Sequence, residues 1–217
     1  MVTIGPVSRP SPSPPRGRHA PPLEVRQDLQ RRRLFAAAAT VFARVGYADA
    51  TAEAIAREAG MSKATFYEHF DNKEDCIVAL FDAAIGVVSG AMQHAVARQH
   101  DGAQGTVHAA VHAFLQALID FPDEAQTLLV EIVGAGPRAM ERRDAALDRV
   151  AATIDELNRE DAERGAARRF ASPHDAFAIV GAVVELASRQ IRTGRPASIA
   201  ELEPVVERLV LGLVGEA

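Results

Sequence analysis

Cysteine and aromatic residues are scarce in this chain of 217 residues, and tryptophan is absent. The low cysteine and aromatic contents each argue against a class of structure or site. A single cysteine excludes an internal disulfide framework and a zinc site built from several cysteines. Aromatic residues make up only 5% of the chain, which argues against a β-sandwich or barrel. No uninterrupted apolar run reaches about 18 residues, so we expect neither a transmembrane helix nor a membrane partner.

Alanine is abundant instead, with 42 residues, and it is the strongest helix former. Hydrophobic residues make up 48% of the chain, enough to bury a core. The composition therefore predicts an all-α protein.

The net charge of −5 is unevenly distributed along the chain. Residues 1–75 carry 11 Lys+Arg and 9 Asp+Glu, whereas residues 76–217 carry 13 and 20. The N-terminal third is thus the part compatible with a nucleic-acid partner. The only two lysines, Lys63 and Lys73, both lie in it.

Residues 1–22 contain seven of the twelve prolines, which predicts a disordered Pro/Arg-rich tail. Its basic residues could touch DNA backbone, but a solvated tail is the simpler interpretation. The arginines at 31–33, followed by alanines, resemble a twin-arginine export signal. The apolar residues that follow have helical spacing, so we expect a cytoplasmic protein instead.

Hydrophobic periodicity, Gly/Pro breaks and capping residues predict about nine helices after the tail. Asn72, Ser172 and Ser198 are expected as N-caps, with Pro173 in the first turn after Ser172. The expected helices cover residues 24–45, 52–59, 63–69, 73–98, 106–120, 123–133, 137–164, 173–193 and 199–214.

Residues 51–70, TAEAIAREAGMSKATFYEHF, have the pattern of a helix-turn-helix motif. Gly60 suits the turn, Ser62 caps the second helix, and Phe66 and Phe70 face inward. The residues left outward, available to a major groove, are Lys63, Ala64, Thr65, Tyr67, Glu68 and His69.

The stretch from about 31 to 85 resembles the DNA-binding domain of the TetR (tetracycline repressor-like) family. The resemblance rests on Phe42, Gly46, Tyr47, Thr51, Ile55, Ala56, Ala59, Gly60, Ser62, Thr65, Tyr67, His69, Phe70, Lys73 and Glu74. It implies an N-terminal DNA-binding domain at 23–72 and an effector-binding and dimerisation domain at 73–217. The positions that it implies for DNA contact are Thr51, Lys63, Ala64, Thr65, Tyr67, His69 and Lys73.

The chain departs from the family pattern at three positions. Ala52 stands where many members have a second hydroxyl residue, and Ala64 where many have glycine. Glu68 is acidic on the side expected to face DNA.

The last two expected helices have unusually broad apolar faces, and one face on each needs a second partner. The resemblance implies that they form a four-helix bundle in a homodimer; burial within a monomer is the alternative. The residues expected at the interface are Phe177, Val180, Val184, Ile191, Leu202, Val206, Leu209 and Leu213.

The region between the two ends is the expected effector pocket, although its residues are equally suited to a plain core. Its interior offers few polar groups, which favours a largely apolar effector. The candidate lining is Phe81, Ile85, His108, His112, Phe114, Leu118, Phe121, Met140 and Glu185.

His108 and His112 are four residues apart on one expected helix, but no third metal ligand lies near them in sequence. The chain also lacks H-E-x-x-H and the common nucleotide and hydrolase motifs. We therefore expect no metal, no cofactor and no enzymatic activity, and a buried Cys76. A metal-dependent enzyme in a helical bundle is the less favoured alternative.

Together with these features, the resemblance to the TetR family implies a ligand-responsive transcriptional repressor. We expect it to bind a near-palindromic double-stranded operator as a homodimer and to be released by a small, largely apolar effector. An activator or a ligand-independent regulator is the alternative within the same class.

Overall fold

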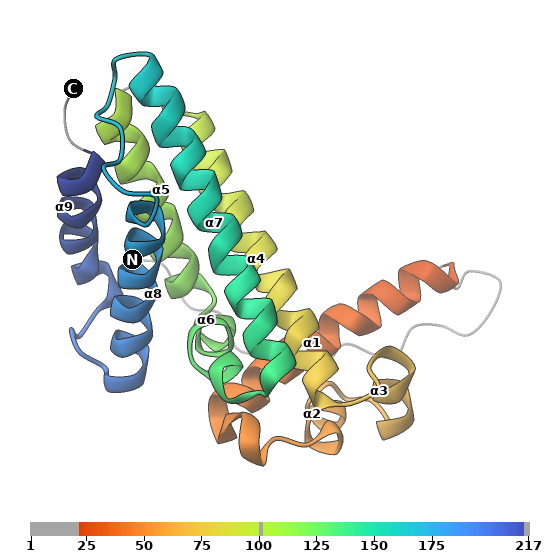
Figure 1. The fold of residues 1–217 in the computed structure, drawn as a ribbon. Helices are drawn as coiled ribbons and strands as arrows, with labels where there is room; N and C mark the ends of the chain where they lie inside the picture. Colours follow the sequence, from red (N-terminus) through yellow and green to blue (C-terminus); the bar gives the residue numbers. More distant parts are fainter. Residues whose placement is uncertain (1–21, 100–101, 215–217) are drawn as a thin grey trace, which may run out of the picture.

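The computed structural model describes residues 22–99 and 102–214, and every regular element within them is helical (Figure 1). The predicted all-α class is confirmed, and the predicted tail lies outside the described residues apart from Pro22. The elements are α1 (Leu23–Asp49), α2 (Ala52–Glu58), α3 (Lys63–His69), α4 (Lys73–Ala97), α5 (Gly102–Asp120), α6 (Pro122–Leu129), the 3₁₀ helix η1 (Glu131–Gly134), α7 (Pro137–Glu163), α8 (Asp175–Thr193), the 3₁₀ helix η2 (Ile199–Leu202) and α9 (Glu203–Val214).

The helices form a small head, α1–α3, at one end of an elongated body, α4–α9 (Figure 1). In the body α4 packs along α5, α7 along α8, and α5 against α9. The head joins the body mainly through α1, which packs against α6 and η1. One core runs through both parts, and its fully buried side chains include Leu34, Phe42, Ile55 and Phe66 in the head and Ile132 at the junction.

Local signals account for most helix ends. Gly46 has φ +77°, a left-handed backbone that ends the regular part of α1 where the sequence predicts it. Asn72 caps α4 by accepting a hydrogen bond from the Asp75 amide, and Ser198 forms a capping box with Glu201.

The predicted start of α8 is wrong. The N-cap of α8 is His174, not Ser172. The Ser172 hydroxyl accepts the His174 amide, and the Ser172 amide donates to Asp175, so these bonds form a turn before the helix. Two other predicted helices, at 123–133 and 199–214, each contain a 3₁₀ segment, η1 and η2.

One helix among the described residues, α4, is long and apolar enough to cross a membrane by length and composition. The expectation of no transmembrane helix rested on a different measure of the sequence. It considered uninterrupted runs, which Asp82 breaks, whereas mean hydropathy tolerates one charge. The core helix of a soluble protein passes the same test, and α4 packs against α1, α5, α6 and α7.

Candidate nucleic-acid interface and ligand grooves

The helix-turn-helix is built by two capped short helices and a glycine turn. The Thr51 hydroxyl accepts the Ala54 amide at 3.1 Å, and the Ser62 hydroxyl accepts the Thr65 amide at 3.1 Å. Gly60 has φ +65°, and the Met61 amide donates to the Ala56 carbonyl at 2.8 Å. These bonds fix the angle between α2 and α3.

An aromatic cluster anchors α3 to α1. Phe66 is fully buried, its ring centroid lies 5.4 Å from that of Phe70, and Phe70 lies 5.8 Å from Phe35 of α1. The Arg31 guanidinium lies over both Phe35 and Phe70, at 5.2 and 5.5 Å from the ring centroids. The inward orientation predicted for Phe66 and Phe70 is confirmed, and it turns the opposite face of α3 outward.

Most residues proposed for DNA contact lie on α3 and differ in exposure. Lys63 and Ala64 are exposed in its first turn, and Tyr67 is 49% exposed. Thr65 is half-buried, as is His69, whose Nε2 lies 3.4 Å from Gln30 Oε1 of α1. The exposed residues of α3 are therefore accessible to a groove of DNA, while its half-buried residues also contact the rest of the head.

Thr51 lies apart from these residues, at the start of α2, and is exposed. Its oxygen accepts the Ala54 amide, so its hydroxyl proton remains able to donate to an external acceptor such as a phosphate.

Lys73, at the start of α4, is turned back onto the end of α1. Its ammonium donates hydrogen bonds to the carbonyl oxygens of Tyr47, Ala48 and Ala50 at 2.8, 2.9 and 3.1 Å. Nζ also lies 4.5 Å from the centroid of the Tyr47 ring. An ammonium has three N–H donors, so all of them have acceptors within the chain. These contacts assign Lys73 a positioning role in place of the expected phosphate contact.

Directed hydrogen bonds join the head to the body. The Thr40 hydroxyl donates to Asp123 Oδ2 at 2.8 Å, and the Tyr47 amide donates to Glu131 Oε2 at 2.7 Å. The other Glu131 oxygen accepts from Gln126 Nε2 at 2.9 Å. Movement of α6 or η1 would therefore move α1.

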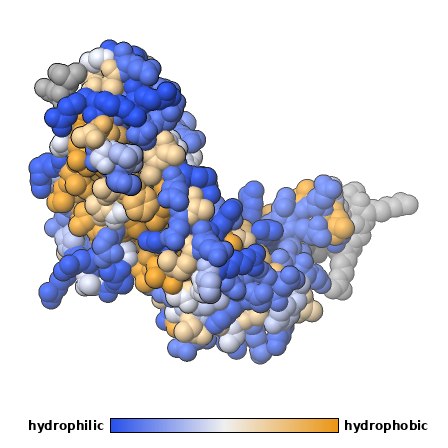
Figure 2. Space-filling view, viewed as in Figure 1, coloured by the Kyte–Doolittle hydropathy of each residue, from blue (hydrophilic) through white to orange (hydrophobic). Residues whose placement is uncertain are grey.

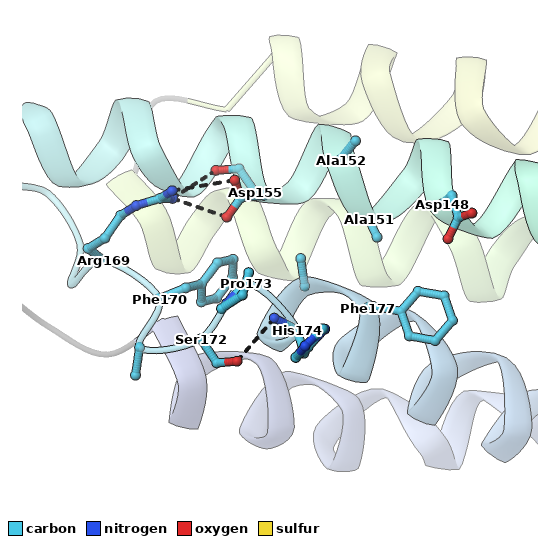
Figure 3. Close-up of a pocket in the computed structure, with 12 residues that line it drawn as sticks. Asp148, Ala151, Ala152, Asp155, Arg169, Phe170, Ser172, Pro173, His174 and Phe177 are labelled. Carbon is cyan, nitrogen blue, oxygen red and sulfur yellow. Dashed lines mark hydrogen bonds and ion pairs between the residues drawn. The ribbon is translucent and has the colours of Figure 1, made fainter.

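Two of the grooves formed by the described residues involve the body. The first, of about 610 Å³, lies between α7 and the start of α8 (Figure 3). The Arg169 guanidinium at its rim hydrogen-bonds the Asp155 carboxylate, and the rings of Phe170 and Phe177 line it. The second, of about 430 Å³, is lined from α1, α5, α6, α8 and the segment before α9. Its lining is Ala43, Leu118, Ile119, Pro122, Asp123, Ala125, Gln126, Gln190, Ile191, Ala197, Ser198 and Ile199.

The residues proposed for an effector pocket do not converge on one cavity. Of these nine residues, Leu118 alone lines either of the two grooves described above, and it lines the second one. Phe81 is packed in the core, Ile85, Phe114 and Met140 are half-buried, and Phe121 is 49% exposed. The expectation that His108, His112 and Glu185 are interior polar groups is wrong, because their side chains are 58%, 58% and 67% exposed. Helical periodicity predicts which face of a helix is buried. It does not predict which pairs of buried faces leave a cavity between them.

His108 and His112 have partners that are remote in sequence. His108 Nδ1 lies 2.6 Å from Glu207 Oε1, and His112 Nδ1 lies 3.0 Å from Glu203 Oε1. The hydrogen bond to Glu207 raises the pKa of His108. The only signal for these contacts in the sequence is that the two histidines and the two glutamates have the same four-residue spacing, each pair on its own helix.

The residues expected at a dimer interface divide into two groups. Phe177 is 47% exposed, whereas Val184, Ile191, Leu209 and Leu213 are half-buried. A direct interface role for the others is wrong: Val180, Leu202 and Val206 pack in the core of their own chain at 5%, 6% and 2% exposure. Figure 2 shows hydrophobic residues gathered on the face of the body over α8.

Cys76 is buried, as expected, on the inner face of α4. Burial raises the pKa of its thiol to about 12. The thiol therefore stays protonated at neutral pH and is a core side chain.

Residues 34–80 match the family model of bacterial regulatory proteins of the tetR family. No curated protein sequence matches the chain.

Several solved structures share the fold of nearly the whole chain. The fatty acid degradation regulator FadR from Bacillus halodurans superposes with a TM-score of 0.74 at 22% identity, covering 84% of this chain and 94% of its own. FadR from Bacillus subtilis, in complex with stearoyl-CoA, gives 0.75 at 18% identity, covering 85% and 99%. The TetR-family regulator PfmR from Thermus thermophilus gives 0.65 at 23% identity, covering 85% and 97%. At these identities the likeness establishes the fold.

Proposed function

We propose that this chain, whose residues 34–80 match the tetR family model, is a cytoplasmic homodimeric transcriptional repressor of that family, released from its operator by an apolar effector. The observation that carries the proposal is the geometry of α3, whose Phe66 and Phe70 lock one face to α1 and leave Lys63, Ala64 and Tyr67 exposed. The matching family and folds are those of regulators, which agrees with a function other than catalysis.

For DNA, we propose that α3 enters the major groove from its N-terminal end, with Lys63, Ala64 and Thr65 nearest the base edges and the adjoining phosphates. Thr51, Tyr67 and His69 would contact phosphates. One motif per chain reads one half-site, so a dimer would bind half-sites with centres about 34–36 Å, or a multiple of that, apart.

For dimerisation, we propose the exposed apolar face of α8 and α9. Phe177 and Val205, at 47% and 38% exposure, lie on these two helices. A large exposed aromatic ring beside further apolar side chains is typical of an interface. Sedimentation of the free chain at micromolar concentration tests this directly, and a monomer that remains monomeric on DNA would contradict it.

For the effector, we propose the second groove. Its volume of about 430 Å³ suits a small molecule, and Leu118, Ile119, Ile191 and Ile199 supply apolar contacts. Two of its polar residues, Asp123 and Gln126, also belong to the hydrogen bonds that hold α1. A ligand that hydrogen-bonds Asp123 and Gln126 would weaken their hydrogen bonds to Thr40 and Glu131. The loss of these bonds would favour a different orientation of the head.

The test begins with selection of an operator from random duplex DNA by the purified chain. A thermal-shift screen then compares apolar compounds with strongly anionic ones. A long-chain acyl-CoA, the class of ligand in the Bacillus subtilis structure, joins an apolar chain to an anionic head and is tested as a separate third arm. We expect apolar compounds to stabilise the protein and release DNA. Gln126→Leu removes the hydrogen bond to Glu131 and should weaken operator binding even without effector, while Gln116→Leu, on the exposed face of α5, should not. Release by highly charged compounds alone would contradict the proposed effector class.

Repression is distinguished from activation by a reporter placed behind the selected operator. A repressor lowers expression until the effector is added. Lower expression on deletion of the regulator would favour the activator alternative instead.

A further inference from the structure

Four ionisable side chains meet where α5 packs along α9. His108 and His112 are one turn apart on α5, and Glu203 and Glu207 are one turn apart on α9. His108 Nδ1 lies 2.6 Å from Glu207 Oε1 and 3.9 Å from Glu203 Oε1. His108, Glu203 and Glu207 each offer one ligand atom, and all three atoms lie within 4.8 Å of one another.

When the imidazoles of this cluster are neutral, the negative charges of Glu203 and Glu207 are not balanced by a positive charge within the cluster. The side chains of Glu203 and Glu207 are only 22% and 26% exposed, and they flank the buried Val206. Within residues 22–99 and 102–214 their ion-pair partners are imidazoles, with no lysine or arginine among them. Two carboxylates held close together and partly out of water favour a bound cation.

We infer that His108, Glu203 and Glu207 bind a divalent transition-metal ion, with His112 positioning Glu203. Zn²⁺ binds imidazole nitrogen at about 2.0–2.1 Å and carboxylate oxygen at about 2.0–2.2 Å, so neighbouring ligands of a tetrahedral ion lie about 3.3–3.5 Å apart. The two distances from His108 Nδ1, 2.6 and 3.9 Å, lie on either side of that spacing. Small side-chain rotations would therefore create the site.

His112 supplies the outer support that such sites have. Its Nδ1 lies 3.0 Å from Glu203 Oε1, so it can hydrogen-bond the carboxylate and fix its direction. The His108 side chain is 58% exposed, which leaves the ion a path from solvent and room for a water as fourth ligand. Because its ligands come from α5 and α9, the ion would clamp the last helix to the body.

The experiment uses the full chain, stripped of metal with a chelator and carrying no affinity tag. Calorimetric titration with ZnCl₂ should show one ion per chain, and Zn²⁺ should raise the thermal midpoint while Mg²⁺ should not. His108→Ala and Glu207→Gln should weaken Zn²⁺ binding by more than about 100-fold, and His112→Ala by about 10–100-fold. His174→Ala, at the start of α8, removes an exposed histidine outside the cluster and should change nothing.

Glu207→Gln preserves side-chain shape, so its thermal midpoint in chelator checks that the variant folds. Absence of a stoichiometric ion in the wild-type chain would overturn the inference, as would equal affinity of the wild type, His108→Ala and Glu207→Gln. Neither measurement involves DNA, so the result is separate from the proposed regulatory function.

Discussion

The two lysines of this chain allow one substitution to separate a positioning role from DNA contact. Lys63 is exposed in the first turn of α3, whereas Lys73 uses all three ammonium donors on backbone carbonyls at the end of α1. Replacing either by Met removes one positive charge and shortens the side chain by only one atom. We therefore expect two opposite phenotypes from the same chemical change.

Lys73→Met should lower stability. A hydrogen bond to a charged group contributes roughly 1.5–3 kcal/mol, and a cation–π contact about 0.5–1 kcal/mol. Water can replace the ammonium at the exposed Ala48 carbonyl, which leaves the part-buried carbonyls of Tyr47 and Ala50 to account for the cost. We expect a loss of about 3 kcal/mol, which for a chain of this size lowers the thermal midpoint by roughly 6–12 °C.

Lys63→Met should leave the thermal midpoint unchanged but weaken operator binding. If Lys63 neutralises a phosphate, the slope of log K against log salt should flatten by about 0.9 for each copy in contact. Lys73→Met should leave that slope unchanged at temperatures where the variant is folded. The assays are differential scanning calorimetry and operator titration at several salt concentrations. A flattened slope with an unchanged midpoint for Lys73→Met would refute the positioning role.

Three other side chains are suited to single-substitution tests. Phe66→Ala should cost about 3–5 kcal/mol in urea unfolding, because the ring is fully buried in the head; a cost below about 1 kcal/mol, roughly the value of a surface change, would contradict this packing. Phe177→Asp should convert a dimer to a monomer in sedimentation, while Val133→Asp, 50% exposed on η1, should not. Cys76 should resist iodoacetamide at pH 8 until urea unfolds the chain. Its folded-state pKa of about 12 exceeds the ordinary 9.0, so stability present below pH 9 is lost as pH rises toward 12, and Cys76→Ala should lack that part of the loss.

The head was largely predictable from the sequence because its signals are local. Helix 63–69 was predicted with the bounds that α3 has, since Ser62 caps it and Phe66 and Phe70 mark its inner face. Gly46 and Asn72 likewise ended and began helices as expected. Caps and turns depend on residues three or four apart, which a sequence displays directly.

The grooves, side-chain clusters and exposed faces of the body were less predictable, because they depend on how its helices pack against one another. The apolar faces of α8 and α9 were identified, but Val180, Leu202 and Val206 fill their own core, and only the packing shows that Phe177 remains exposed. His108 lies 99 residues from Glu207, so no local spacing could join them. Grooves and side-chain clusters are properties of helix pairs rather than of single helices.

The junction between head and body explains how a distant groove could control DNA binding. Thr40 is held by Asp123 and the Tyr47 amide by Glu131, both through hydrogen bonds shorter than 3 Å that depend on direction. An apolar contact tolerates sliding, whereas a short hydrogen bond is lost when its partner turns away. Because Asp123 also lines the second groove, a ligand there needs to displace few bonds to free α1. A double-mutant cycle between Thr40→Val and Asp123→Asn should therefore show coupling in effector-induced release, and strictly additive effects would separate the groove from the head.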